Sequence, residues 1–488
     1  MKNHYTYRLH RWSKRFASLL PVAMNHSTTP VHLPRLVCGD DQLPRFVRDC
    51  ATTMAVRSKL RLLAWEKMAE PISRQWFGQE SVPLVSYVGA FLVKLDQKLS
   101  STSHLRRFLV QHPALVWALG FPLYGQTPTR HGFDPELSLP TRQQFSHVLR
   151  TLDNACLQLL LTEQVQQLQS LLPASFGQTI SLDTSHILAW VKENNPRQFI
   201  KEGRFDKEKQ PTGDADCKLG CKRAHNRLLK TPSKEGMPAE FIAYKDKEFY
   251  WGYASGAVVT KVTGWGEFVL AEMTDTFDKD DVRYFFPLMA QVEAHLGFRP
   301  RFGTLDAAFD AFYVYDYFHS DEVDGEQGFA AVPLKQPNAP KRFFDVAGLP
   351  LCVADLPMPI RKTYMDRTKA IMPHQRAIHA CPLLYPKSTD QVCPVSHKQW
   401  GKGGCTVNLP TSIGARLRHQ LDRNSDEYKQ VYKQRTAVER IFSQAKAFGM
   451  DRPKLRNQQA ITNLNTMIYL LINCRALQQV LAKLEQDK

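Results

Sequence analysis

The feature that most constrains this chain is an ordered run of strand-like and helical segments between residues 178 and 334. Five segments rich in aromatic and β-branched residues have the composition of strands, namely residues 178–183, 249–262, 267–273, 301–306 and 328–334. Residues 278–296 and 309–318 separate the last three of them, and the first of the two repeats apolar residues at helical spacing. This alternation predicts an α/β domain in which helices flank a sheet.

Two of the predicted strands end on an acidic residue, Asp183 and Asp306. The order of three strands, a helix, a strand, a helix and a strand resembles that of ribonuclease-H-like domains, which have a mixed five-stranded sheet with flanking helices. Such a match of element order carries little about function by itself. We expect this fold here, and if the two acid-terminated strands are neighbours, their carboxylates lie close together.

A helix predicted to begin near Ser425 and to run to about Lys446 carries the most specific pattern in the chain. We measure angles around this helix from Tyr432, at about 100° per residue. Arg435, Glu439 and Lys446 then fall at roughly 300°, 340° and 320°, so the four side chains share one face. An adjacent apolar stripe can pack against a sheet: Val431, Val438, Ile441, Phe442 and Ala445. The alternative is an exposed helix with an ordinary i, i+4 ion pair between Arg435 and Glu439.

Asp183, Asp306 and Glu439 become candidate metal ligands if this helix packs across the two strands. Three carboxylates at one point repel one another, and hard divalent cations with oxygen ligands relieve that repulsion. A pair of Mg²⁺ (or Mn²⁺) ions is the known arrangement for in-line attack on phosphodiesters. We therefore expect two ions at these acids, with Arg435 and Lys446 holding nearby phosphates.

The spacing Y-x2-R-x3-E-x6-K from Tyr432 to Lys446 resembles the Y-R-E-K signature of bacterial insertion-sequence DDE transposases. The sequences ISLDTS at 180–185 and LDAAFD at 305–310 resemble the first and second catalytic-aspartate motifs of that family. WGY at 251–253 resembles its second strand. Four residue types at fixed spacing, with two acids in the right order, make this a specific resemblance.

The resemblance implies a role for each of these side chains. It assigns the metal-binding catalytic triad to three acids, Asp183, Asp306 and Glu439. It assigns contacts with transposon-end DNA to three further side chains, Tyr432, Arg435 and Lys446. The implied reaction is hydrolysis at the transposon ends, followed by attack of the freed 3′-hydroxyls on target DNA. Because two ends are joined in one complex, the resemblance also implies a homodimer on DNA.

The resemblance extends over roughly residues 175–475, and we divide the chain into four parts. The N-terminal part is mostly helical by its spacing, begins one helix with a capping box at Thr141, and by resemblance recognises terminal inverted repeats. A catalytic part is followed by a β-rich insertion and then by the helix that carries Glu439. The predicted boundaries are 1–175, 176–336, 337–424 and 425–488.

The chain carries 64 Lys and Arg against 47 Asp and Glu, a net charge of +17. Such a surplus suggests a polyanionic partner, nucleic acid first and an anionic membrane surface second. Lys222 and Arg223 lie in a basic segment that could line the path of DNA, although a solvated basic loop explains it equally well. Asp214 and Asp216 in the same segment close no predicted strand, so we prefer Asp183 as the catalytic acid.

The insertion carries Cys352, Cys381, Cys393, His397 and Cys405. Of these, Cys393, His397 and Cys405 lie in a Pro- and Gly-rich setting and could hold a structural Zn²⁺. Their spacing is not the tight C-x2-C type, and ordinary buried thiols with a surface histidine are the preferred interpretation. Trp400 is the only tryptophan of the insertion. It could stack on a base flipped out of DNA, as in some family members, but a core or hairpin tryptophan is the favoured alternative.

The compartment follows from two observations. No apolar run approaches the roughly 18 residues that span a bilayer. Ten scattered cysteines without a secretion signal fit a reducing cytosol. We therefore expect a cytoplasmic bacterial DNA transposase. One alternative is a metal-dependent nuclease of the same fold that cuts DNA without joining strands. The other is a catalytically inactive, transposon-derived DNA-binding protein, against which the presence of all three acids argues.

Overall fold

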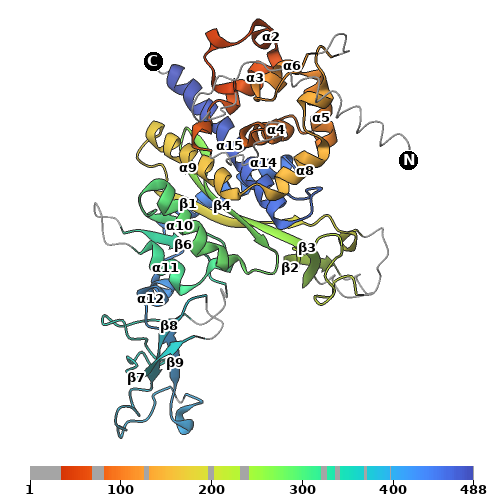
Figure 1. The fold of residues 1–488 in the computed structure, drawn as a ribbon. Coiled ribbons are helices and arrows are strands. Elements are labelled where there is room, and N and C mark those ends of the chain that lie inside the picture. The colour runs from red at the N-terminus through yellow and green to blue at the C-terminus, as the bar shows by residue number, and fades with distance from the viewer. Residues whose placement is uncertain are drawn as a thin grey trace.

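The protein is described by a computed structural model. A bundle of helices covers one face of a long sheet, and a second, smaller sheet stands at the far end of the molecule (Figure 1). The residues that the structure describes are 35–68, 82–125, 131–195, 203–230, 241–319, 327–335, 341–367, 371–395 and 397–486. The first 34 residues of the predicted N-terminal region therefore lie outside the described part of the chain.

The described N-terminal region is helical, as its spacing predicts. Its helices are α2 (Arg45–Arg48), α3 (Ala51–Leu60), α4 (Leu84–Asp96), α5 (Thr102–Gln111), α6 (Pro113–Ala118), α7 (Pro135–Ser138), α8 (Arg142–Thr151) and α9 (Asn154–Leu171). The capping box at the start of α8 is confirmed. The Gln144 N–H donates to Thr141 Oγ1 over 3.2 Å, and the Thr141 N–H donates to Gln144 Oε1 over 2.9 Å.

The last helix, α15 (Gln458–Gln486), joins this bundle to the sheet. It packs against α4, α8 and α9 on one side and against β4 on the other. Asn473 lies fully buried on α15 and hydrogen-bonds to both backbone groups of Val269 in β4, over 2.9 and 2.8 Å. The N-terminal bundle and the sheet therefore share one continuous core through α15.

The main sheet has six strands: β1 (Thr179–Leu188), β2 (Lys218–Lys230), β3 (Phe241–Val262), β4 (Gly266–Thr276), β5 (Phe302–Thr304) and β6 (Phe329–Ala331). Their order is β2-β3-β1-β5-β6, with β4 also paired to β3. The pairs β1–β3, β2–β3 and β3–β4 are antiparallel, whereas β1–β5 and β5–β6 are parallel. The α/β class and the mixed sheet are thus confirmed, and the order is compatible with a ribonuclease-H-like fold.

Two expectations about the strands were wrong. The basic segment, in which we predicted no strand, contains β2, which pairs with residues 241–252 of the long strand β3. Its sequence carries no alternating apolar pattern, so only the pairing with β3 makes it a strand. Asp183 does not end its strand either, because β1 continues to Leu188, where the backbone pairs with Gly252. Asp306 lies two residues beyond the end of β5.

Helices cover both faces of the sheet. Beside α15, the helix α14 (Thr436–Ala447) packs against β1 and β3. On the opposite face lie α10 (Phe285–Leu296) and α11 (Phe312–Phe318) with their own apolar cluster. Gly303 of β5 permits the close approach of α11, because a Cβ there would stand 2.2 Å from the ring of Phe318.

The helix predicted from Ser425 to Lys446 is interrupted. It consists of α13 (Asp426–Tyr432), a 3-10 turn η8 (Lys433–Arg435) and then α14. The interruption coincides with a contact to the sheet, since the Ser181 hydroxyl of β1 donates to the Gln434 carbonyl over 2.8 Å. A 3-10 turn has 3.0 residues per turn, so the uniform angle that we used for Tyr432 and Arg435 does not hold across it.

The insertion forms a small antiparallel sheet, with strands β7 (Ile360–Asp366), β8 (His374–Ala380) and β9 (Thr406–Pro410). It stands apart from the main sheet in Figure 1. The chain returns through α12 (Ile413–Gln420), which packs on α11. Arg418 of α12 forms a two-pronged ion pair with the fully buried Asp310, over 2.7 and 2.5 Å.

The described helices were also compared with the dimensions of a bilayer. None of them is both long enough and apolar enough to pass through a membrane.

Candidate active site

Three hydroxyl and carbonyl groups hold the elements of the candidate site together. The Thr304 hydroxyl of β5 donates to the Ser181 hydroxyl of β1 over 3.0 Å, and Ser181 donates in turn to the Gln434 carbonyl of η8. Ser181 and Thr304 are buried. Asp183 follows Ser181 by two residues, Asp306 follows Thr304 by two, and Arg435 follows Gln434 directly. This chain of hydrogen bonds therefore fixes the positions from which the charged side chains extend.

Arg435 lies between two of the predicted triad acids. Its Nη2 is 3.3 Å from Asp183 Oδ2, and its Nη1 is 2.7 Å from Glu439 Oε1. The Asp183 side chain is 18% exposed and the Glu439 side chain is 50% exposed, so the ion pairs run from the sheet outward to solvent. The Nε–H of Arg435 is buried and has no hydrogen-bond partner in the described structure. This buried donor of the guanidinium is thus available to a further acceptor.

Asp306 completes the predicted triad. It caps the short turn η6 (Ala307–Phe309), where its Oδ1 accepts from the Ala308 N–H over 2.8 Å. Burial and, after it, the nearby charge of Asp306 raise the pKa of Asp183 to about 7, against the opposing effect of Arg435. Burial also raises the pKa of Asp306, although its backbone hydrogen bond and Arg435 act against the rise. The two aspartates therefore repel each other at the same site.

Asp281 is a fourth carboxylate that the sequence analysis missed. It begins the turn η5 (Asp281–Tyr284) and accepts a 2.6 Å hydrogen bond from the Thr184 hydroxyl of β1. Its charge also disfavours ionisation of Asp183 and Asp306. An acid at a helical start, before an apolar run, has the pattern of an ordinary cap, so no local signal marked it. We call this group the acid site: Asp183, Asp281, Asp306, Arg435 and Glu439.

Tyr432 borders the acid site. Burial raises its pKa, Arg435 opposes the rise, and the charges of all three triad acids reinforce it. Its ring stacks on that of Tyr428, with centroids 5.7 Å apart and planes at 13°. Tyr432, Arg435 and Glu439 therefore interact although the helix is interrupted between them, and the placing of Lys446 on the same face stays a prediction.

Lys446 and Lys222 both act through their charges on His186 of β1, three residues beyond Asp183. Burial and, after it, the charges of Lys222 and Lys446 lower the pKa of His186 to about 4. His186 is therefore neutral near pH 7, and the local positive charge comes from the two lysines. Both lysines are exposed. They lie on different elements, β2 and α14, so no local spacing pointed to their shared effect on His186. The side chain of Arg223 lies outside the described residues.

The remaining candidates lie elsewhere. Asp214 is buried and accepts hydrogen bonds from Tyr253 over 2.9 and 3.0 Å, whereas Asp216 caps the start of α15 at the Gln458 N–H over 2.9 Å. Both aspartates thus have structural partners. Trp400 begins the short turn η7 in the insertion, where its N–H donates to the His397 carbonyl over 2.7 Å. Within one chain this places Trp400 beside the small sheet rather than beside the acids.

The donors of the acid site suit a hard divalent cation. Carboxylate oxygens are the ligands that Mg²⁺ prefers. Burial first, and then the charges of neighbouring carboxylates, raise the pKa of Asp183 and Asp306, and a cation would relieve the repulsive part. No three Asp, Glu, His or Cys side chains in the described part of the chain already stand close enough to hold one ion. Arg435 accounts for this, because it occupies the space between Asp183 and Glu439. The residues fit Mg²⁺ or Mn²⁺ provided that Arg435 moves aside.

Comparison with known proteins does not assign the chain to a family. No model of a known protein family matches the chain. A search of curated proteins likewise returns no significant match.

Proposed function

We propose that the chain is a DNA transposase of the DDE class with a ribonuclease-H-like catalytic domain. In this proposal it cleaves transposon ends and joins their 3′-hydroxyls to target DNA. The observation that carries the proposal is the acid site, in which Asp183 on β1, Asp306 just beyond the neighbouring strand β5 and Glu439 on α14 all act on Arg435. Acids so placed suit phosphoryl transfer, where positioning and charge stabilisation do most of the work.

The charged side chains have separable tasks in this proposal. Held by Asp183, Asp306 and Glu439, two Mg²⁺ ions would activate the attacking oxygen and stabilise charge on the leaving oxygen. Arg435 neutralises the carboxylates in the free protein and turns to a DNA phosphate when they are occupied. Its buried, unpartnered Nε–H supports this, since a guanidinium binds phosphate through several donors in a fixed fork.

The path of DNA continues from the acids toward Lys446 and Lys222. The charges of both lysines act on His186, which lies three residues beyond Asp183 in β1. Neutralising phosphates releases counterions and therefore favours binding at low salt. We propose that a transposon end lies along these lysines with its scissile phosphate at Asp183. Two such ends are held by a homodimer, and the N-terminal helices contact the terminal inverted repeats.

The acid site does not by itself separate a transposase from a nuclease of the same fold, so the test is strand transfer. The purified protein is incubated with Mg²⁺, a supercoiled plasmid and a duplex that carries the inverted repeat found beside the gene, supplied either pre-cut or uncut at the transposon end. We expect joined product that depends on the free 3′-hydroxyl. A matched duplex with a 3′-deoxy end serves as the control and gives no product.

Three outcomes of this assay count. Joined product from the 3′-hydroxyl end alone supports the transposase. Cleavage of uncut ends without any joined product favours the nuclease and contradicts the proposal. Binding of the repeat with neither cleavage nor joining, in both Mg²⁺ and Mn²⁺, points to an inactive DNA-binding protein.

A further inference from the structure

The insertion brings cysteines together from distant positions in the sequence. Cys381 directly follows β8 and Cys405 directly precedes β9. These strands are antiparallel, and their last paired residues are Ala380 and Thr406. Cys381 and Cys405 are therefore cross-strand neighbours one step beyond the ladder, although 24 positions separate their numbers. In the sequence, no other cysteine lies within ten positions of Cys381.

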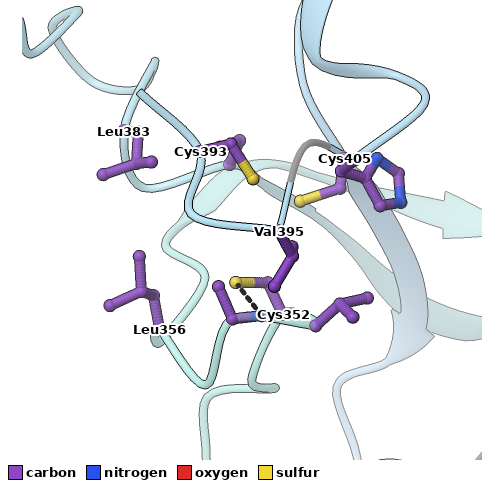
Figure 2. Close-up of a pocket in the computed structure, with 10 residues that line it drawn as sticks. Cys352, Leu356, Leu383, Cys393, Val395 and Cys405 are labelled. Atoms are coloured by element: carbon purple, nitrogen blue, oxygen red, sulfur yellow. Dashed lines mark hydrogen bonds between the residues drawn. The ribbon is translucent and has the colours of Figure 1, made fainter. Parts of the chain in front are cut away.

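Two further cysteines reach the same end of the small sheet. Cys352 begins a tight turn in which the Asp355 N–H donates to the Cys352 carbonyl over 3.0 Å, and Cys393 lies in the loop between β8 and β9. Figure 2 shows the sulfur atoms of Cys352, Cys393 and Cys405 directed toward a common space. Cys381 lines the same cavity, whose volume is about 10 Å³. We call these four residues the cysteine cluster.

A backbone hydrogen bond reaches one sulfur of the cysteine cluster. The Ala354 N–H donates to the Sγ of Cys352 over 3.4 Å, and such hydrogen bonds stabilise the negative charge of a ligating sulfur. Cys405 interacts electrostatically with both Cys381 and Cys352. These three sulfurs are thus within electrostatic reach of one another, as a shared ligand site requires.

His397 also lines the cavity, but its hydrogen bonding argues against a role as ligand. The Gln399 N–H donates to His397 Nδ1 over 3.2 Å. With Nδ1 accepting, a neutral imidazole carries its proton on Nε2, and neither nitrogen then has a free lone pair for a metal. The four cysteines therefore form the more complete donor set.

The small sheet has little else to stabilise it. Six of the seven residues of β7 are exposed, among them Ile360 at 46% and Met365 at 52%. Few side chains of the insertion are buried, and the fully buried ones include Met358 and Ala377. A sheet of three short strands needs a covered apolar face or another constraint to be stable. Small units of this kind commonly rely on a metal or on disulfides.

We propose that Cys352, Cys381, Cys393 and Cys405 bind one structural Zn²⁺ ion. Tetrahedral coordination by four sulfurs selects zinc or an iron–sulfur cluster, and a cavity that holds about one water-sized sphere admits a single ion rather than a cluster. The four thiols would lose their protons on binding. Because no three of them already stand at metal spacing in the described structure, the loops must draw the sulfurs inward. This site is independent of the proposed DNA chemistry.

The test is the metal content of the full-length protein purified without chelators. We expect about one zinc ion per chain by elemental analysis, as four-thiolate structural sites hold. Cys381→Ser and Cys405→Ser should each remove most of it. Cys221→Ser is the matched control, because Cys221 is an exposed thiol on β2, and it should retain the zinc. His397→Ala should also retain it.

A second measurement covers variants that fail to fold. The unmodified protein is stripped of metal and titrated with Co²⁺, which should give visible absorption bands of tetrahedral thiolate coordination that Zn²⁺ then abolishes. Four results would overturn the proposal: folded protein with no bound zinc after reconstitution, iron in place of zinc, a Cys381–Cys405 disulfide, or equal zinc loss in the Cys221→Ser control. Each of these is distinct from a failure of strand transfer.

Discussion

The molecule contains two clusters of candidate metal ligands, and they are built in opposite ways. The acid site stands on β1, η6 and α14, in the middle of a domain whose core runs from the N-terminal helices to α15. The cysteine cluster stands on the loops at one end of a small sheet with few buried side chains. In the first, protein packing places the ligands whether or not an ion is present. In the second, we expect the ion itself to contribute to folding.

This contrast has an electrostatic side. In the acid site an internal cation, Arg435, already compensates part of the negative charge through Asp183 and Glu439. The cysteine cluster needs no such cation while its residues are neutral thiols, and it becomes negatively charged only when a metal displaces the protons. A preformed site with its own cation suits exchangeable ions and substrate, whereas a site that folds with its ion suits permanent binding.

The largest expected effect is the loss of catalysis without loss of fold. Glu439→Gln should reduce Mg²⁺-dependent cleavage by about 1,000-fold or more, equivalent to roughly 4 kcal/mol or more of transition-state stabilisation. Because the Glu439 side chain is half exposed, the free energy of unfolding of the variant should differ from that of the natural protein by less than about 1 kcal/mol. Glu427→Gln, at an exposed position of α13, is the control. Normal cleavage by Glu439→Gln would show that Glu439 has no catalytic role.

The next effect concerns the joint between the two regions. Asp310→Ala should lower the free energy of unfolding by about 3 to 5 kcal/mol, because it leaves Arg418 without its buried partner. The measurement is denaturant unfolding followed by hydrogen exchange in α12. The control is Asp426→Ala, which breaks an exposed pair with Lys429 and should cost about 0.5 kcal/mol. Equal costs for the two variants would contradict this assignment of Asp310.

The third prediction uses the pKa of Asp183, which is raised from 3.8 to about 7. Between these pH values the folded protein holds a proton that the unfolded chain has released, so stability falls as pH rises through about 7. Asp183→Asn should therefore be more stable than the natural protein at pH 8, by on the order of 2 to 4 kcal/mol less the lost contact with Arg435. Thermal unfolding across pH checks this.

A matched control for that experiment is Glu272 of β4, which lies two strands across the sheet from Asp183 and has its hydrogen-bond partners outside the acid site. Burial raises its pKa to about 7 as well, and it accepts hydrogen bonds from Thr466 and Gln158. Glu272→Gln should likewise be more stable than the natural protein at pH 8. Mg²⁺ should leave this difference in the free energy of unfolding unchanged. In contrast, Mg²⁺ should stabilise the natural protein and not Asp183→Asn. The same Mg²⁺ response in both variants would argue against metal binding at Asp183.

The smallest expected effect lies on the proposed DNA path. Lys222→Ala should weaken binding of the transposon end uniformly across sequences and reduce the slope of log affinity against log salt by about 1. Lys261→Ala removes an exposed lysine on β3 and is the control, with an unchanged slope. Fluorescence anisotropy at several salt concentrations measures both. An unchanged slope for Lys222→Ala would place the DNA elsewhere.

Much of the fold could be predicted from the sequence, because helical and strand spacing are local properties. The five predicted strands and the last helix are all present. The strand β2 was missed, since its basic sequence lacks alternation and its pairing with β3 alone makes it a strand. The break at η8 was also missed, because it follows from a hydrogen bond between Ser181 and Gln434, two residues far apart in the chain.

The sequence by itself determined the types and spacing of the residues at the acid site. Tyr432, Arg435 and Glu439 lie within eight positions, so a helical repeat was enough to group them. Only the tertiary structure decided that Asp281 joins them and that four separated cysteines meet at one end of a sheet. The physical reason is that such meetings depend on strand pairing and packing between distant segments, which local spacing does not encode.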